Sequence, residues 1–238
     1  MLYLIGLGLD KNDITLKGME AIRNCQRIYL ENYTSYVNVF EIERIIGMTT
    51  IPAARTFVED GEEILKEAKK KNVALLVLGD PLSATTHIDL VLRAKKQKIN
   101  VKIVHSVSIF NAIAECGLQL YKFGKTASIP KWQANFRPES FYDMIIDNLG
   151  IKAHTLLLLD IGLSVNEALE YIEGISKPRN DGLLNKKIIV CEKVGTEEQK
   201  FTYNTISSLI KKKFNVPACI IVPSELHFVE EEALKTFK

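Results

Sequence analysis

The sequence predicts an α/β fold in which helices cover a parallel or mixed sheet. Short apolar runs alternate with amphipathic segments along all 238 residues. The apolar runs are nearly continuous in Val, Ile and Leu, which is typical of strands buried on both faces. The segments between them carry apolar residues at helical spacing, as helices that cover such a sheet require.

The expected strands are short and consist mainly of Val, Ile and Leu. They cover residues 2–7, 73–78, 101–104, 155–159, 187–191 and 219–222. Segment 126–137 contains a proline and the only tryptophan and has no clear helical period. It predicts a strand followed by an ordered loop.

The expected helices carry apolar residues at helical spacing, and that at 108–116 is compact and apolar. They cover residues 14–25, 62–70, 108–116, 138–149 and 165–173. In the second of these, Ile64, Leu65 and Ala68 share one face, and lysines occupy the other. Pro138 would occupy the first turn of its helix, where a residue without an N–H group is tolerated.

Two domains are expected, residues 1–120 and 121–238. The first series of strands and helices ends at Cys116-Gly117, and Gly124 interrupts the chain before a second series begins. The length suits one large domain or two small ones.

Charge and cysteine usage disfavour several classes of protein. With 25% charged residues and a formal net charge of +2, the chain does not predict a nucleic-acid binder. The four cysteines form no C-x-x-C pair, which argues against zinc and disulfides and favours a reducing compartment, most simply the cytosol. No apolar stretch reaches the roughly 20 residues needed to span a bilayer. We also expect no signal peptide and no metal site.

The first expected strand runs into a glycine-containing loop. Gly6 and Gly8 allow a ligand or another backbone segment to approach closely. One interpretation is the dinucleotide fingerprint G-x-G-x-x-G, with Glu31 placed to bind a ribose hydroxyl. The third glycine position is Lys11, however, so NAD binding is disfavoured.

Two further strand ends have polar exits. The strand at 73–78 leads into GDPLSATTH (residues 79–87), where Asp80 is either a cap of the turn or a ligand contact. The side chains able to cap the following helix are those of Ser83, Thr85 and Thr86. The strand at 101–104 leads to Ser108, a natural N-cap. Because ligands of open α/β sheets lie beyond the carboxyl ends of strands, the three exits together predict a crevice for an adenosine-like ligand.

Six stretches, in order and at matching spacing over nearly the whole chain, carry a family resemblance. They are MLYLIGLGLDKNDITLKGMEAI, LENYTS, GDPLSATTH, SIFNAIAECGLQLYKFGKTASI, FRPESFYD and HTLLLLDI. Together they resemble the diphthine synthases, which are tetrapyrrole-methylase-like, or class III, methyltransferases. The resemblance implies two α/β domains per chain, a homodimer, and S-adenosylmethionine bound in the interdomain cleft. It also implies repeated methylation of the 3-amino-3-carboxypropyl-histidine intermediate on translation elongation factor 2, in diphthamide biosynthesis.

Motif matching implies cofactor contacts in both domains. They are Leu9, Asp80, Ser83, Ser108 and Ile109 in the first, and Leu159, Val194 and Ala218 in the second. The chain departs from the family pattern at Glu192-Lys193, where Ala-Arg is common. It departs again at Ala218, where histidine is common, so a contact there would involve only backbone or van der Waals atoms.

Tyr33 and Arg137 are candidates for substrate contact, although Arg137 could equally form a surface ion pair. No catalytic proton acceptor is identified. The histidines are more typical of structural hydrogen-bonding residues than of catalysts; they are His87, His105, His154 and His227.

Other functions remain open at this point. The chain could be a class III methylase that acts on a tetrapyrrole or on RNA, although its weak basicity disfavours RNA. It could also bind the elongation factor without catalysis, or be a dehydrogenase. Relatives of the archaeal type add three methyl groups and those of the eukaryotic type add a fourth as a methyl ester. The FRPESFYD stretch leans toward the eukaryotic type.

Overall fold

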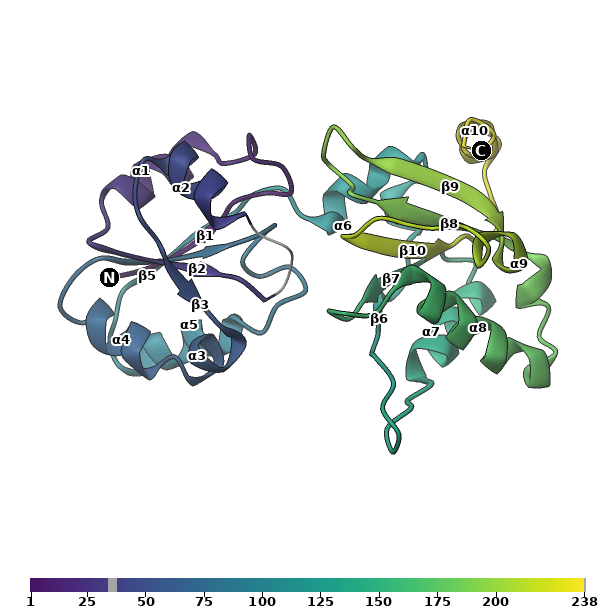
Figure 1. Ribbon diagram of the computed structural model, residues 1–238, viewed down its shortest axis with the longest axis horizontal. Coiled ribbons are helices and arrows are strands. Elements are labelled where there is room, and N and C mark those ends of the chain that lie inside the picture. The colour runs from purple at the N-terminus through teal and green to yellow at the C-terminus, as the bar shows by residue number, and fades with distance from the viewer. Residues whose placement is uncertain (34–37, 238) are drawn as a thin grey trace. The chain divides into compact units, whose positions relative to one another are not determined.

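In the part of the chain that the structure describes, two five-stranded sheets each have their own hydrophobic core. A computed structural model describes residues 1–33 and 38–237 (Figure 1). The chain divides into two units, Met1–Ala112 and Ile113–Lys238. This division falls a few residues before the boundary that the sequence suggests, and the domain limits 1–120 and 121–238 stay a prediction.

The sheet of the first unit is entirely parallel, with strand order β3-β2-β4-β1-β5. Its strands are β1 (Leu2–Gly6), β2 (Arg27–Glu31), β3 (Ile51–Ala53), β4 (Val73–Val77) and β5 (Val101–Val104). Because parallel strands end at the same edge, the exits of β2, β4, β1 and β5 lie side by side.

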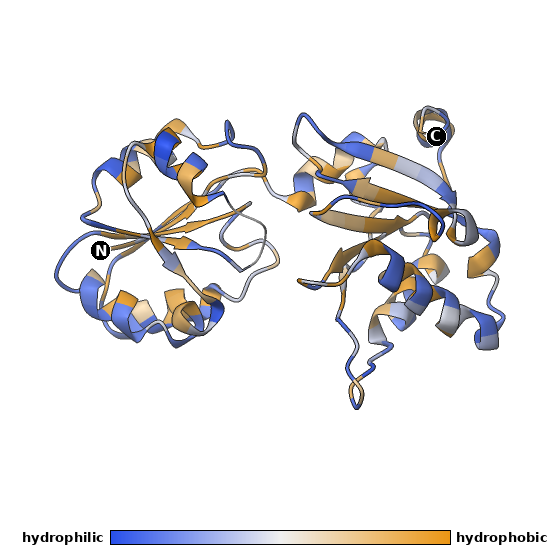
Figure 2. Ribbon diagram, viewed as in Figure 1, coloured by the Kyte–Doolittle hydropathy of each residue, from blue (hydrophilic) through white to orange (hydrophobic). Residues whose placement is uncertain are grey.

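Helices cover both faces of this sheet, as expected. They are α1 (Leu16–Arg23), α2 (Val39–Ile46), α3 (Arg55–Asp60), α4 (Glu62–Ala68), α5 (Ile88–Lys96) and the short α6 (Ile109–Ala112). The helices α1 and α2 pack on one face, and α3, α4 and α5 pack on the other (Figure 1). Hydropathy follows this layering, since the strands are apolar and the helices carry polar residues on part of their surface (Figure 2).

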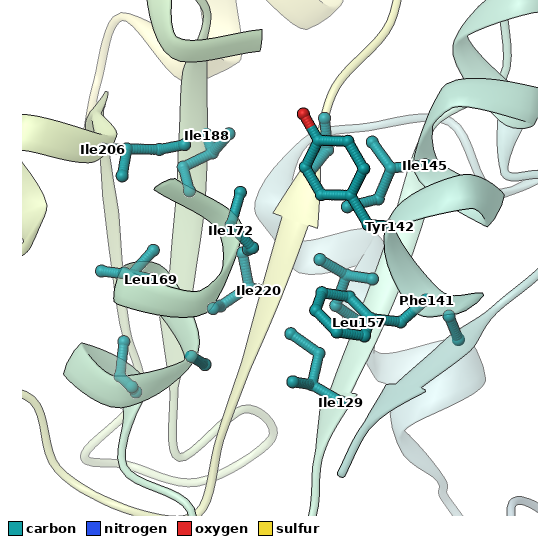
Figure 3. Close-up of a cluster of buried hydrophobic side chains, with 14 of the residues drawn as sticks. Ile129, Phe141, Tyr142, Ile145, Leu157, Leu169, Ile172, Ile188, Ile206 and Ile220 are labelled. Atoms are coloured by element: carbon teal, nitrogen blue, oxygen red, sulfur yellow. The ribbon is translucent and has the colours of Figure 1, made fainter. Parts of the chain in front are cut away.

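The second unit has a mixed sheet with strand order β6-β7-β10-β8-β9, in which only β6 and β7 pair in parallel. Its strands are β6 (Ala127–Ile129), β7 (Thr155–Leu159), β8 (Lys187–Glu192), β9 (Lys200–Thr205) and β10 (Ala218–Val222). Its helices are α7 (Ser140–Gly150), α8 (Val165–Arg179), α9 (Ile206–Leu209) and α10 (Phe228–Leu234), with 3-10 turns η1 (Ile113–Cys116), η2 (Leu120–Lys122) and η3 (Leu183–Asn185). Figure 3 shows its core, where Phe141 and Tyr142 of α7 and Ile172 of α8 lie near Leu157 and Ile220 of the sheet.

Local signals explain where several elements begin. The Thr15 hydroxyl accepts a hydrogen bond from the N–H of Gly18 and starts α1. Ser164 and Glu167 form a capping box at the start of α8, which runs to Arg179 and is therefore longer than expected. The predicted apolar face of α4 is confirmed, since Ile64, Leu65 and Ala68 are buried.

Three expectations about elements are wrong. Pro138 does not begin a helix, because α7 starts at Ser140. The segment 108–116 is not one helix but α6 followed by a 3-10 turn. The strand β5 is not buried on both faces, because it is an edge strand and Lys102 is exposed.

The four cysteines are buried with free thiols. Burial raises the pKa of Cys25 and Cys116 to about 11. These thiols are therefore protonated at neutral pH and behave as small packing residues. Within the described ranges, no helix combines the length and apolar character needed to cross a membrane. The same residues include no cluster of three or more side chains suited to hold a metal ion.

Candidate functional site

The exits of β1 and β4 are joined through two glycines. The N–H of Gly79 donates to the carbonyl of Gly8 at 2.8 Å, and the N–H of Gly8 donates back at 3.2 Å. Both glycines have positive φ, +82° at Gly8 and +74° at Gly79. At Gly6, an added Cβ would lie 2.6 Å from the carbonyl oxygen of Gly79. The close approach of these two exits therefore requires glycine.

Asp13 holds the loop after β1, a role that the sequence analysis missed. Its Oδ2 accepts hydrogen bonds from the N–H groups of Leu9 at 2.9 Å and Asp10 at 3.0 Å. Its carbonyl accepts one from the Ser106 hydroxyl at 3.1 Å, which ties this loop to the exit of β5. An aspartate three residues after Asp10 in a glycine-containing loop is a local signal that could have indicated such a turn.

Asp80 connects the exit of β4 to the exit of β5. Its Oδ1 accepts from the Leu82 N–H at 3.0 Å, and its Oδ2 lies 2.7 Å from His105 Nδ1 and 3.2 Å from the Ser106 N–H. Burial on its own raises the pKa of Asp80, but these hydrogen bonds outweigh burial and lower the pKa below its ordinary value. Asp80 is therefore a buried carboxylate that is charged at neutral pH and shapes the turn. A cofactor contact at Asp80 remains a prediction.

Gly79 has room for a small side chain between two of the exits. An added Cβ there would meet only the Leu9 side chain and the Val107 carbonyl, both at 3.9 Å. This space is bounded by the loops after β1 and β5, where the sequence predicts an adenosine-like ligand.

The other predicted contacts of the first unit lie in the same loops. The Ser83 hydroxyl is 3.3 Å from Asp80 Oδ1. Ser108 precedes α6, and its N–H donates to Asn111 Oδ1 at 2.8 Å, while Ile109 begins the helix.

The expected capping of α5 is wrong. That helix begins at Ile88, with His87 at the N-cap position and no side-chain cap. None of Ser83, Thr85 or Thr86 takes that role, and the Thr85 hydroxyl instead donates to the Pro81 carbonyl at 2.6 Å.

The predicted contacts of the second unit lie at one end of its three central strands. Leu159 is the last residue of β7 and Ala218 the first of β10, and these strands run antiparallel, with Cys219 opposite Leu158. Val194 follows the end of β8, whose Glu192 pairs with Ala218. The register therefore brings Leu159, Val194 and Ala218 to the same end of three neighbouring strands.

The histidines all make hydrogen bonds. His154 is fully buried; it accepts from the Ser224 N–H at Nδ1, and its Nε2 lies 3.2 Å from Glu230. Burial lowers the pKa of His154 despite this carboxylate. His227 caps α10, and His105 contacts Asp80.

His87, like His154, is buried against a carboxylate. Its ring is buried, with Nε2 2.9 Å from Glu31 Oε2 and 3.2 Å from the Tyr33 hydroxyl. Glu31, which a dinucleotide site would have used for a ribose, is thus directed to a histidine. Tyr33 lies in the LENYTS stretch, residues 30–35, of which 34 and 35 fall outside the described residues.

Arg137 lies in the second unit, in the loop between β6 and α7. Its guanidinium carbon is 6.0 Å from the ring centroid of Trp132. Trp132 in turn stacks on Tyr171 of α8, with ring centroids 3.9 Å apart. A cation–π contact therefore accounts for part of its environment, and substrate contact at Arg137 stays a prediction.

Comparison with known proteins identifies the class. Residues 1–210 match the family described as Tetrapyrrole (Corrin/Porphyrin) Methylases. Since this match covers most of the chain, the protein belongs to the tetrapyrrole methylase family and is a methyltransferase.

Individual relatives narrow the assignment. The chain is 40% identical to the diphthine methyl ester synthase of Schizosaccharomyces pombe, over 100% of this chain and 94% of the relative. It is 40% identical to the diphthine synthase of Methanocaldococcus jannaschii, over 99% and 98% of the two chains. A crystal structure of diphthine synthase superposes with a TM-score of 0.91 at 32% identity, over 99% and 95%. Within the methylase family, the chain therefore groups with the diphthine synthases.

Proposed function

We propose that this protein transfers methyl groups from S-adenosylmethionine to the amino group of the 3-amino-3-carboxypropyl-histidine side chain of elongation factor 2, in diphthamide biosynthesis. The diphthine synthase names of full-length relatives from a eukaryote and an archaeon support this function. The structural observation that carries the proposal is the meeting of the β1 and β4 exits at Gly8 and Gly79, beside the loops of Leu9 and Val107. By the same resemblance, we expect a homodimer that works in the cytoplasm without nucleic acid or membrane.

The donor set at this edge suits S-adenosylmethionine. The side chain of Leu9 offers an apolar surface, and the loops supply backbone N–H and carbonyl groups for an adenosine. Asp80 supplies one fixed negative charge near a ligand whose sulfonium is positive. We expect Leu9, Asp80, Ser83, Ser108 and Ile109 to contribute from the first unit. From the second, we expect Leu159, Val194 and Ala218.

The reaction does not require the protein to form a covalent bond to the substrate. When bound, S-adenosylmethionine supplies a methyl group that its sulfonium has already activated. The loops must hold the acceptor amine in line with that methyl, and such positioning can supply about 7–11 kcal/mol of a reaction barrier. The acceptor must also give up a proton, because an ammonium has no lone pair with which to attack.

The test is methyl transfer to elongation factor 2 that carries the unmethylated intermediate, with the modified peptide read by mass spectrometry. Three added methyls would establish the archaeal type of reaction and four the methyl-ester-forming type. Binding of S-adenosylmethionine without transfer to a competent substrate would refute the proposal and favour a binding-only role or a different acceptor.

A matched pair of variants tests the cofactor site. Asp80→Asn should weaken binding of S-adenosylmethionine by about tenfold or more, because it removes the negative charge near the sulfonium. A factor of ten corresponds to about 1.4 kcal/mol of binding free energy. Asp89→Asn, at an exposed carboxylate of α5 that pairs with Arg93, should leave binding unchanged. Thermal melts of both variants would separate a lost contact from a lost fold.

A further inference from the structure

A cluster of polar side chains, those of Glu31, Tyr33 and His87, lies where β2 ends. The side chains of Glu31 and His87 are 0% and 1% exposed, and Glu31 Oε2 is 2.9 Å from His87 Nε2. The Tyr33 hydroxyl is 3.2 Å from the same nitrogen. On the other side of the ring, Nδ1 is 3.0 Å from the Pro81 carbonyl oxygen. Removing charged groups from water is unfavourable, so a pair of this kind is poorly explained by stability alone.

The Pro81 carbonyl fixes which nitrogen can exchange a proton. A carbonyl oxygen only accepts hydrogen bonds, so Nδ1 must carry a hydrogen to bond with it. The remaining nitrogen, Nε2, can then either accept from the Tyr33 hydroxyl or carry a second proton and donate to Glu31. Tyr33 and Glu31 both lie within hydrogen-bond distance of Nε2, so a proton that arrives through Tyr33 can bind to this nitrogen.

Tyr33 is suited to pass a proton on and not to hold a charge. Burial, with the nearby carboxylates of Glu31 and Glu59, raises the pKa of Tyr33 above its ordinary value, although Arg55 opposes this. The hydroxyl therefore keeps its own proton at neutral pH, and it can accept one proton only as it gives up another.

His87 belongs to the same loop that would hold the methyl donor. That loop, residues 79–87, is fastened at its first end to the exit of β5, through Asp80. At its last end it is fastened to the exit of β2, through His87. One short loop thus connects the proposed cofactor contacts to a buried acid–base group.

We propose that Tyr33 and His87 form the route by which the acceptor amine loses its proton, with Glu31 as the counter-charge. This inference rests on the proposed function. The acceptor ammonium gives a proton to the Tyr33 oxygen while the tyrosine's own proton passes to His87 Nε2. The freed lone pair then forms the bond from nitrogen to the methyl carbon, and the carbon–sulfur bond breaks with its electrons left on sulfur. Release of the proton from His87 to solvent resets the group for the next methylation.

Other charged groups surround this route. Glu59 lies on α3, and Asp89 and Arg93 lie on α5; together with His87 they line part of a cavity of about 150 Å³. Arg93 is already engaged, since it pairs with Asp89 at 2.8 Å and donates to the Glu59 carbonyl at 2.7 Å. The Glu59 carboxylate is also one of the groups that raise the pKa of Tyr33 and so keep its hydroxyl protonated.

The experiment compares the pH dependence of methyl transfer in three variants. Tyr33→Phe removes the hydroxyl, and His87→Gln removes the ring that receives the proton. Tyr29→Phe is the matched control, because Tyr29 lies on β2 and its hydroxyl also forms a side-chain hydrogen bond, here to the carboxylate of Glu67 at 2.9 Å and not to His87. Initial rates would be measured from pH 6 to 10 at saturating S-adenosylmethionine, together with the affinity for that cofactor and a thermal melt.

We expect Tyr33→Phe to lower the rate at pH 7 by about 100-fold, the lower end of what general acid–base groups contribute. The loss should shrink as pH rises, because solvent then removes the proton from the amine. Cofactor affinity should be unchanged, and Tyr29→Phe should follow the unmodified protein. If Tyr33→Phe and a folded His87→Gln keep the full rate, or if the loss is the same at every pH, the relay is wrong. If the unmodified protein transfers no methyl to a competent substrate, the proposed function itself falls and this inference with it.

Discussion

Replacement of Glu230 by glutamine tests how the second unit holds its C-terminal helix. Glu230 lies on α10 and is completely buried. Its carboxylate accepts hydrogen bonds from the N–H of Gln119 at 2.9 Å, the N–H of His227 at 2.7 Å and the Lys122 ammonium at 2.5 Å. His154 Nε2 lies 3.2 Å away. One carboxylate therefore joins α10 to the turn at η2 and to the sheet.

The magnitude follows from the burial of this group. Glutamine keeps the shape of the side chain but removes its charge and turns one acceptor into a donor. Breaking a buried ion pair from one side costs about 3–5 kcal/mol. We expect about 3 kcal/mol, the lower end, because the Lys122 side chain is 22% exposed and keeps some solvation.

The pH dependence supplies a second, independent check. Burial on its own raises the pKa of Glu230, but the hydrogen bonds from Lys122, Gln119, His227 and His154 outweigh it and lower the pKa to about 2. The ordinary value, which applies to the unfolded chain, is 4.5. Because the folded pKa is the lower one, the stabilisation is complete above pH 4.5 and is lost as pH falls toward 2.

The assay is urea unfolding of the unmodified protein and Glu230→Gln between pH 7 and 3. The difference in free energy of unfolding should be near 3 kcal/mol at pH 7 and should narrow below pH 4.5. Glu225→Gln is the control, since Glu225 pairs with Lys152 where both side chains are 69% exposed, and such pairs contribute about 0–1 kcal/mol. A Glu230→Gln difference below about 1 kcal/mol, or one that does not change with pH, would refute this account of the carboxylate.

Three further substitutions, one of them a control, probe two separate features. Gly79→Ala should weaken binding of S-adenosylmethionine by at least about tenfold, because the new methyl enters the space beside Leu9; Gly47→Ala has a similar positive φ with nothing within 4 Å and should only lower stability, by about 1 kcal/mol. Calorimetric titration and thermal melts of both would contradict this if the two variants bound the cofactor alike. Trp132→Leu should lower stability by about 1 kcal/mol through loss of its stacking on Tyr171, and a melting temperature unchanged from the unmodified protein would show that this stack contributes nothing.

How far the sequence predicts this fold depends on the chemistry of each strand. The strands β1, β4 and β10 are apolar runs buried on both faces, and their periodicity identified them. The strand β9 reads KFTYNT, alternates polar and apolar residues and lies at an edge, so it has no apolar run. The strand β2 begins and ends with charged residues, Arg27 and Glu31, which hid it in the same way.

The candidate site divides along a similar line. That the exits of β1 and β4 would meet follows from the rule that parallel strands end at one edge, and the Gly8–Gly79 contact agrees with it. The contact between Tyr33 and His87 joins residues 54 positions apart. No local pattern records such a pairing, because it depends on β2 and β4 being neighbours in space while β3 separates them in sequence. In the second unit, Leu159, Val194 and Ala218 were predicted only through family resemblance.

The strand order is consistent with the two tasks proposed for one loop, cofactor binding and proton transfer. The chain leaves β1 and β2 for α1 and α2, which cover one face of the first sheet. It leaves β4, which lies between β1 and β2, for α5 on the opposite face (Figure 1). The loop of residues 79–87 therefore turns away from both of its neighbours, and ligands of such sheets bind where adjacent exits part in this manner. On its β1 side lies Leu9, whose side chain would be 3.9 Å from a Cβ at Gly79, and on its β2 side lie Glu31 and Tyr33. One loop can therefore hold a methyl donor on one side and a proton acceptor on the other at a fixed distance. No single residue then has to bind the donor and also accept the proton.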